Sequence, residues 1–157
     1  MDRKRLAGIT SEIEAQVKLI AMVSDRLQSR VDEGLDKPSQ LDSAAFQTHN
    51  LYCAVEDLLK LIAKNFENHI GSGGDWHRVL LLRMSQPVRG IRPAFLQEDS
   101  LAAMNKLRGF RHFVRHAYGM EIEIDQLQSN LRAAQNLYQL ISRDADVFLK
   151  TLTGPED

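Results

Sequence analysis

Hydrophobic residues recur three, four or seven positions apart along most of the chain, which is the pattern of amphipathic helices. The first such stripe runs from Ile9 to Val31, and Gly34 and Pro38 are predicted to end that helix. No segment alternates apolar and polar residues as a half-buried strand would. The pattern therefore predicts an all-helical protein.

A second stripe covers residues 51–70 and predicts a helix that is capped by Asp42 or Ser43 and ends at the glycine-rich segment 71–74. A short third helix follows over residues 76–82, with Asp75 as its expected N-cap. Two prolines and a glycine then predict an irregular connection over residues 86–98, since proline and glycine both interrupt helices.

A fourth helix is predicted to begin at Asp99 or Ser100 and to be followed by Gly119 as its C′ residue. The last stripe covers residues 124–148. Long amphipathic helices with short connections pack most simply as an antiparallel bundle. The expected fold is therefore all-α: a single domain over residues 1–157, built as an antiparallel four-helix bundle with one additional short helix.

Composition places the protein in a reducing compartment. Its only cysteine, Cys53, lies in an apolar stretch and cannot form an internal disulfide. The basic N-terminus is followed by charged residues instead of an apolar signal region, and no apolar run approaches the roughly 18 residues of a membrane span. We therefore expect a soluble, cytoplasmic protein without a membrane partner.

The net charge of −1 conceals a basic region. Residues 77–116 carry eight lysines and arginines against two acidic residues, a net +6, which leaves −7 on the rest of the chain. A local basic field on a nearly neutral protein suits a ligand that bears phosphate. The simpler alternative is that Arg78, Arg83 and Arg89 solvate loops and pair with acidic residues elsewhere.

The richest chemistry lies in the fourth predicted helix. Arg108, Arg111 and Arg115 are three and four residues apart and so share one face, while His112 and His116 lie on a neighbouring line. Arginine stabilises a phosphate and histidine transfers protons near neutral pH, which suffices for RNA cleavage without a metal. The histidine pair alone could ligate a metal ion, but no nearby cysteine or acid completes such a site, so no metal is expected.

Arg111 and His116 are five residues apart, which places them roughly 140° apart around a helix. Their side chains meet only if both curl toward one pocket, or if two copies of the helix face each other across a two-fold axis. His49, His69 and His77 are isolated and are expected to serve in packing or at the surface. Glu56 and its neighbour Asp57 are expected to pair with the arginines.

The sequence Arg111-His112-Phe113-Val114-Arg115-His116-Ala117-Tyr118 resembles the Arg-x4-His-x-Tyr signature of HEPN-domain ribonucleases, specifically the HepT-like toxins. Three further segments resemble such a chain in the same order, namely Trp76-His77 with the apolar run 79–82, Arg92-Pro93, and 107–118. The family carries a polar residue, often asparagine, where this chain has His112.

The resemblance implies a toxin from a toxin–antitoxin pair that cleaves RNA without a cofactor, as an all-helical homodimer with its motifs at a shared cleft. His116 would act as the general acid or base, and Arg111 would stabilise the charge that develops on the phosphate. His112 would orient the phosphate or share the proton transfer, and Arg108 and Arg115 would support RNA binding.

The resemblance also assigns a partner and a modified residue. In that family the antitoxin is often a minimal nucleotidyltransferase that adds AMP to a tyrosine hydroxyl, and Tyr118 occupies the matching position. Two other functions stay open. The chain could be a non-catalytic HEPN module that binds a nucleotidyltransferase or nucleic acid, or a helical interaction protein in which the motif is accidental.

Overall fold

The computed structural model describes residues 1–67, 73–116 and 119–154, and these residues form five helices. In chain order the helices are α1 (Arg3–Asp32), α2 (Pro38–Glu67), α3 (Trp76–Met84), α4 (Glu98–His116) and α5 (Ile124–Thr153). Extended structure in the described ranges amounts to one isolated bridge between Val88 and Arg92. The predicted all-α fold, with four longer helices and one short helix, is confirmed.

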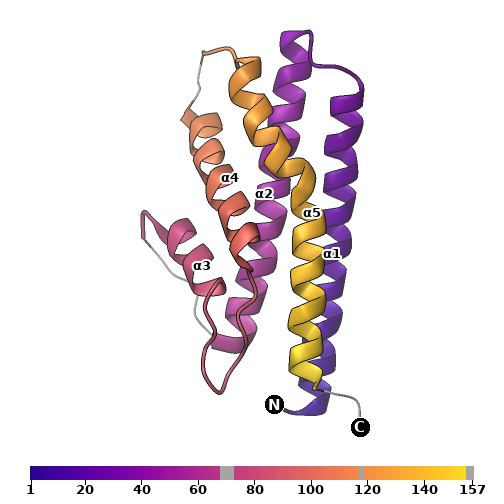
Figure 1. Cartoon of the computed structure of the whole chain (residues 1–157), viewed down its shortest axis with the longest axis vertical. Helices are drawn as coiled ribbons and strands as arrows, with labels where there is room; N and C mark the ends of the chain where they lie inside the picture. The colour runs from indigo at the N-terminus through magenta and orange to yellow at the C-terminus, as the bar shows by residue number, and fades with distance from the viewer. Residues whose placement is uncertain (68–72, 117–118, 155–157) are drawn as a thin grey trace.

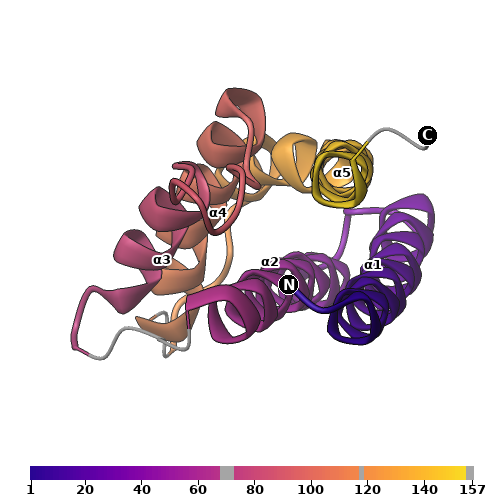
Figure 2. The same cartoon turned by 90° about the horizontal axis from the view of Figure 1, so that it is seen from below.

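The four longer helices run alternately up and down, and the start of α1 lies at the same end as the end of α5 (Figure 1). Helix α2 is central, because it contacts each of the other four helices, whereas α1 and α4 do not touch each other. The short α3 lies outside this bundle against α2 and α4, on the side away from α1 and α5 (Figure 2).

The core forms where the predicted stripes face one another. Ile13 and Ile20 of α1, Leu58 of α2, and Leu137 and Ile141 of α5 have no exposed surface. Burial of each such side chain contributes about 1.5–3 kcal/mol of hydrophobic stabilisation. Because α1, α2 and α5 all exceed seven turns, their mutual packing fixes the frame on which α3 and α4 rest.

The predicted start of the second helix is wrong. Helix α2 begins at Pro38, so Asp42 and Ser43 lie inside it instead of capping it, and Pro38 starts this helix instead of ending α1. Proline suits the first helical position, where no N–H is needed and its fixed φ is already helical. The Gln40 side chain completes the turn by accepting a hydrogen bond from the backbone N–H of Lys37 at 3.0 Å.

Two further helix starts differ from the prediction in detail. Asp75 precedes α3 but makes no capping hydrogen bond, because its carboxylate accepts one from the Arg78 guanidinium at 2.8 Å. Helix α4 begins at Glu98, just before the predicted Asp99 or Ser100. The Asp99 carboxylate instead accepts a hydrogen bond from the backbone N–H of Ser100 at 2.9 Å.

The connection between α3 and α4 is irregular, as predicted, yet it is firmly anchored. The backbone N–H groups of Phe95 and Leu96 both donate to the carbonyl of Met84, at 2.8 and 2.9 Å. The Arg92 side chain is fully buried and pairs with Glu67 at 2.7 Å. This anchoring sets the position at which α4 leaves the loop.

Gly119 has a φ of +72°, the left-handed conformation expected after a helix. The predicted end of the second helix near residues 68–72 lies outside the described residues. Across the described helices, none has the length and apolar character needed to cross a membrane.

Replacement of Phe148 by alanine should destabilise the bundle by about 3–5 kcal/mol, because the ring is buried and packs edge-on against Phe66 and Phe95. Val147→Ala is the matched control, since Val147 is 50% exposed and its truncation should change stability by less than about 0.5 kcal/mol. Urea denaturation measures both values. Equal effects for the two variants would contradict the described packing of α5.

Candidate functional site

A pocket of about 340 Å³ lies between the beginning of α3 and the second half of α4. The lining consists of Gly74, Asp75, His77, Arg78, Arg108, Gly109, Arg111 and His112. It therefore combines three arginines and two histidines with a single carboxylate. The position of this pocket follows from the fold, because α3 packs against α4 and the first turn of α3 lies beside Arg111 and His112.

Five arginines of the basic region fall into two groups. Arg78 pairs with Asp75, while Arg83 and Arg92 both pair with Glu67. These pairs agree with the simpler interpretation of Arg78 and Arg83 as members of internal ion pairs. The positive charge of each of these three arginines therefore lies next to a carboxylate.

Arg108 and Arg111 form the second group. Within the described ranges neither makes an ion pair, and the Nε atom of each is buried without a hydrogen-bond partner. A buried donor without a partner costs about 1–3 kcal/mol, so both side chains are held beside the pocket at a cost in free energy. Two guanidinium groups of this kind in one pocket form a site suited to phosphate.

The structure brings some of the predicted site residues together and leaves others apart. Arg108, Arg111 and His112 share the pocket, whereas Arg115 and His116 are exposed and do not line it. The ring of His116 still lies near, with its centroid 4.5 Å from that of His112. Tyr118, the predicted modification site, lies outside the described residues.

A buried polar cluster that the sequence analysis missed lies directly behind the pocket. One carboxylate oxygen of Glu56 accepts a hydrogen bond from the Tyr52 hydroxyl at 2.7 Å and lies 2.6 Å from Nδ1 of His77. Glu56 therefore contacts a tyrosine and a histidine instead of the arginines, so that expectation is wrong, whereas His77 does pack, against Trp76, in addition to its contact with Glu56. The available signal was the spacing of Tyr52 and Glu56, four residues apart on a helix that is otherwise apolar on its inner side.

Burial and the Glu56 carboxylate raise the pKa values of two groups around this cluster. Burial raises the pKa of the Tyr52 hydroxyl above its ordinary value, and the neighbouring Glu56 carboxylate raises it further. Burial also raises the pKa of the Cys53 thiol, again with a contribution from Glu56. Both groups therefore stay protonated at neutral pH, which leaves Tyr52 able to donate to Glu56.

The arginines of α4 influence α2 as well. Burial lowers the pKa of His49 below its ordinary value of 6.5, and the charges of Arg111 and Arg115 lower it further. His49 lies one turn before Cys53, with Nε2 3.6 Å from the thiol sulfur. The charges of Arg111 and Arg115 on α4 therefore add to the effect of burial on this histidine of the neighbouring helix.

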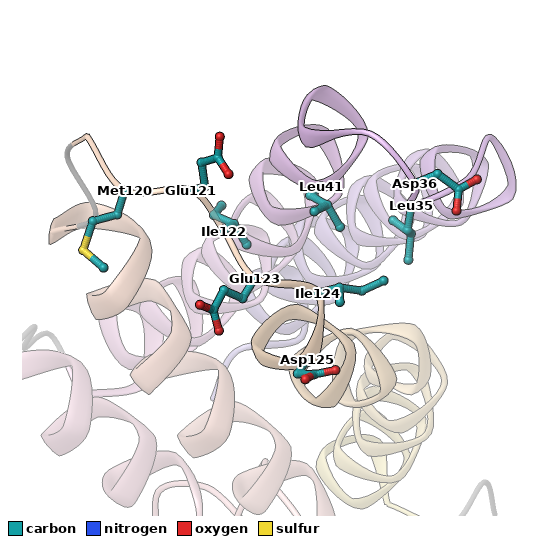
Figure 3. Close-up of a pocket in the computed structure, with 9 residues that line it drawn as sticks. All are labelled: Leu35, Asp36, Leu41, Met120, Glu121, Ile122, Glu123, Ile124 and Asp125. Atoms are coloured by element: carbon teal, nitrogen blue, oxygen red, sulfur yellow. The ribbon is translucent and has the colours of Figure 1, made fainter.

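A second pocket, of about 790 Å³, has the opposite charge. It lies where the α1–α2 turn meets the segment leading into α5, and Figure 3 shows its lining side chains. Four of them are acidic, namely Asp36, Glu121, Glu123 and Asp125. A phosphate-bearing ligand would be repelled there, so it favours the pocket of α3 and α4.

The described residues contain no group of three or more histidine, cysteine, aspartate or glutamate side chains placed to hold a metal ion. The donor set at the pocket of α3 and α4 is dominated by guanidinium groups, which suit an anion. The chemistry of that pocket therefore rests on arginine and histidine.

The protein is an all-helical bundle in which Arg108 and Arg111, neither of them in an ion pair within the described residues, line one pocket together with His77 and His112. A family model described as HepT-like protein matches residues 43–152, which is most of the chain. The chain belongs to the HepT-like protein family, and the resemblance inferred from its motif is confirmed. No curated protein and no solved structure matches the chain.

Replacement of Arg111 by leucine should raise the pKa of His49, because the guanidinium charge opposes protonation of the ring. The value should stay below 6.5, since burial is the larger cause. A lowered folded-state pKa also means that His49 reduces stability as the pH falls through 6.5. NMR titration of the histidine ring measures the shift.

Lys106→Leu is the control for this titration, because it removes an exposed charge from the same helix that does not act on His49. An unchanged pKa in Arg111→Leu would show that the guanidinium does not face α2.

Proposed function

We propose that the chain is a metal-independent endoribonuclease toxin whose phosphate site is the pocket between α3 and α4. One observation carries the proposal: Arg108 and Arg111 line a pocket together with histidines and make no ion pair within the described ranges. Membership of the HepT-like family supports it, and Arg111, the first residue of the Arg-x4-His-x-Tyr motif, lines this pocket.

RNA can cleave itself when its 2′-oxygen attacks the adjacent phosphorus. The 2′-hydroxyl loses a proton, the new O–P bond forms, and the bond from phosphorus to the 5′-oxygen breaks as that oxygen gains a proton. In our proposal Arg111 stabilises the negative charge that develops on the phosphate, and His116 transfers one of the two protons. His112 orients the phosphate, and Arg108 and Arg115 attract the RNA backbone.

A homodimer is part of the proposal. His116 is exposed and lies outside the pocket that contains Arg111, as the spacing of five residues on one helix requires. A second copy packed across the exposed side of α4 would place motif residues from both chains around one phosphate. Each site would then draw on two protomers.

Neutralisation by a minimal nucleotidyltransferase antitoxin completes the proposal. AMP on Tyr118, two residues after His116, would add a bulky anion next to the arginines of α4. That adduct would occupy the phosphate site and oppose binding of RNA.

Replacement of Arg111 or His116 by alanine should each reduce RNA cleavage by at least about 10²-fold, since each removes a group that acts in the transition state. Helicity and dimerisation should stay intact, because His116 is exposed. Gel assays in EDTA with purified wild type and variants measure the effect. Lys106→Ala, which removes an exposed charge of α4 outside the pocket, is the control.

Unchanged cleavage in His116→Ala would refute its assigned role. RNA binding without any cleavage by unmodified wild-type protein would instead identify a non-catalytic nucleic-acid-binding module.

Tyr118→Phe should retain nuclease activity and escape neutralisation, because it removes the hydroxyl that would receive AMP. Co-expression with the nucleotidyltransferase followed by intact mass measurement tests both parts. Tyr138→Phe is the matched control, since Tyr138 lies on α5, outside the motif. Complete neutralisation of Tyr118→Phe without added AMP would refute the proposed modification.

A further inference from the structure

His77 is a histidine of the pocket that lies outside the Arg-x4-His motif. It lies in the first turn of α3 and lines the same pocket as Arg111 and His112. Its side chain is 16% exposed, so it is largely buried yet open to the pocket. His77 is thus a histidine within the arginine pocket itself, whereas His116 lies outside it.

The orientation of His77 is fixed from behind. Its Nδ1 atom lies 2.6 Å from a carboxylate oxygen of Glu56, whose side chain is only 5% exposed. The same oxygen accepts the Tyr52 hydroxyl at 2.7 Å. The indole of Trp76 packs against the other side of the imidazole, with ring centroids 3.6 Å apart.

This arrangement determines which nitrogen is available to a ligand. A neutral imidazole carries one N–H, and the carboxylate acceptor holds that hydrogen on Nδ1. The lone pair is then on Nε2, the atom that does not contact Glu56. A carboxylate that fixes the tautomer of a histidine in this way prepares it to accept a proton.

We propose that His77 is the general base of the cleavage reaction and that Glu56 is its positioning residue. The inference rests on the proposed ribonuclease function and extends it to a residue outside the Arg-x4-His motif. Nε2 of His77 takes the proton of the 2′-hydroxyl as the 2′-oxygen bonds to phosphorus. His116 gives its proton to the 5′-oxygen as the P–O5′ bond breaks, and exchange with water restores both histidines.

The assignment gives each proton transfer its own histidine. In-line attack places the entering and leaving oxygens on opposite sides of the phosphorus, so a single imidazole cannot reach both at once. His77 lies on α3 and lines the pocket with Arg111 and His112, and the ring of His116, at the end of α4, has its centroid 4.5 Å from that of His112. In our proposal His77 and His116 therefore act on the two oxygens of a phosphate bound by Arg111.

The first test compares His77→Gln with wild type in metal-free RNA cleavage. Loss of a general base should reduce the rate constant by about 10²- to 10⁴-fold, with little change in RNA affinity. Lys64→Met is the matched control, because Lys64 is an exposed lysine of α2 that does not line the pocket, and it should cleave like wild type. Urea denaturation of both variants separates a catalytic loss from a loss of folding.

The second test distinguishes the base from the acid. In a substrate whose 5′-bridging oxygen at the mapped cleavage site is replaced by sulfur, the leaving thiolate needs no proton. His116→Ala should regain most of its activity on this substrate, whereas His77→Gln should stay impaired. Recovery of His77→Gln instead would overturn its assignment as the base.

The role of Glu56 has a readout that does not depend on activity. In wild-type protein the ¹⁵N chemical shifts of the neutral His77 ring should show a protonated Nδ1 and an unprotonated Nε2. Glu56→Gln should yield a mixture of tautomers, because an amide can either accept or donate. A His77 ring with the opposite tautomer in wild type would overturn the proposal.

The outcomes separate the two proposals. If wild type cleaves RNA and His116→Ala does not, while His77→Gln cleaves like wild type, the inference about His77 fails and the ribonuclease function stands. If wild type cleaves no RNA, both fail.

Discussion

Burial of α2 is the constraint on which the rest of the structure depends. This helix contacts each of the other four, and its apolar side chains close the bundle against α1 and α5. The side toward α3 carries Tyr52 and Glu56 in place of apolar residues. A buried carboxylate is costly unless it is hydrogen-bonded, so Glu56 holds His77 and with it the first turn of α3. The packing of α2 thereby sets the distance between α3 and α4.

The distance between α3 and α4 leaves a pocket beside the arginines of α4. Arginines with carboxylate partners stabilise the fold, as the buried pair of Arg92 with Glu67 does for the loop before α4. Arg108 and Arg111 have none within the described ranges; both line the pocket, and the charge of Arg111 also acts on the neighbouring His49. Four acidic residues lie instead around the pocket near the α4–α5 connection, where a phosphate would be repelled. The two pockets therefore differ in the sign of their charge.

Much of this organisation follows from the sequence. The apolar stripes predict the five helices, and the motif predicts the helix that carries the arginines, because both depend on spacing along one helix. The start of α2 was misplaced because Asp42 and Ser43 have cap chemistry while Pro38 fits the first turn equally well. The role of Glu56 was missed because its partner His77 lies on a different helix, and a contact between two helices leaves no spacing pattern in the sequence.

In the proposed reaction, RNA bound in the pocket between α3 and α4 is cleaved when the 2′-oxygen of the RNA attacks the adjacent phosphorus. The chemical identity of the product ends tests it most directly, measured by mass spectrometry after digestion of RNA by wild-type protein in EDTA. We expect a 2′,3′-cyclic phosphate on one fragment and a 5′-hydroxyl on the other, because the phosphoryl group is transferred to the 2′-oxygen. Fragments that end in a 3′-hydroxyl and a 5′-phosphate would show attack by water and would contradict the account.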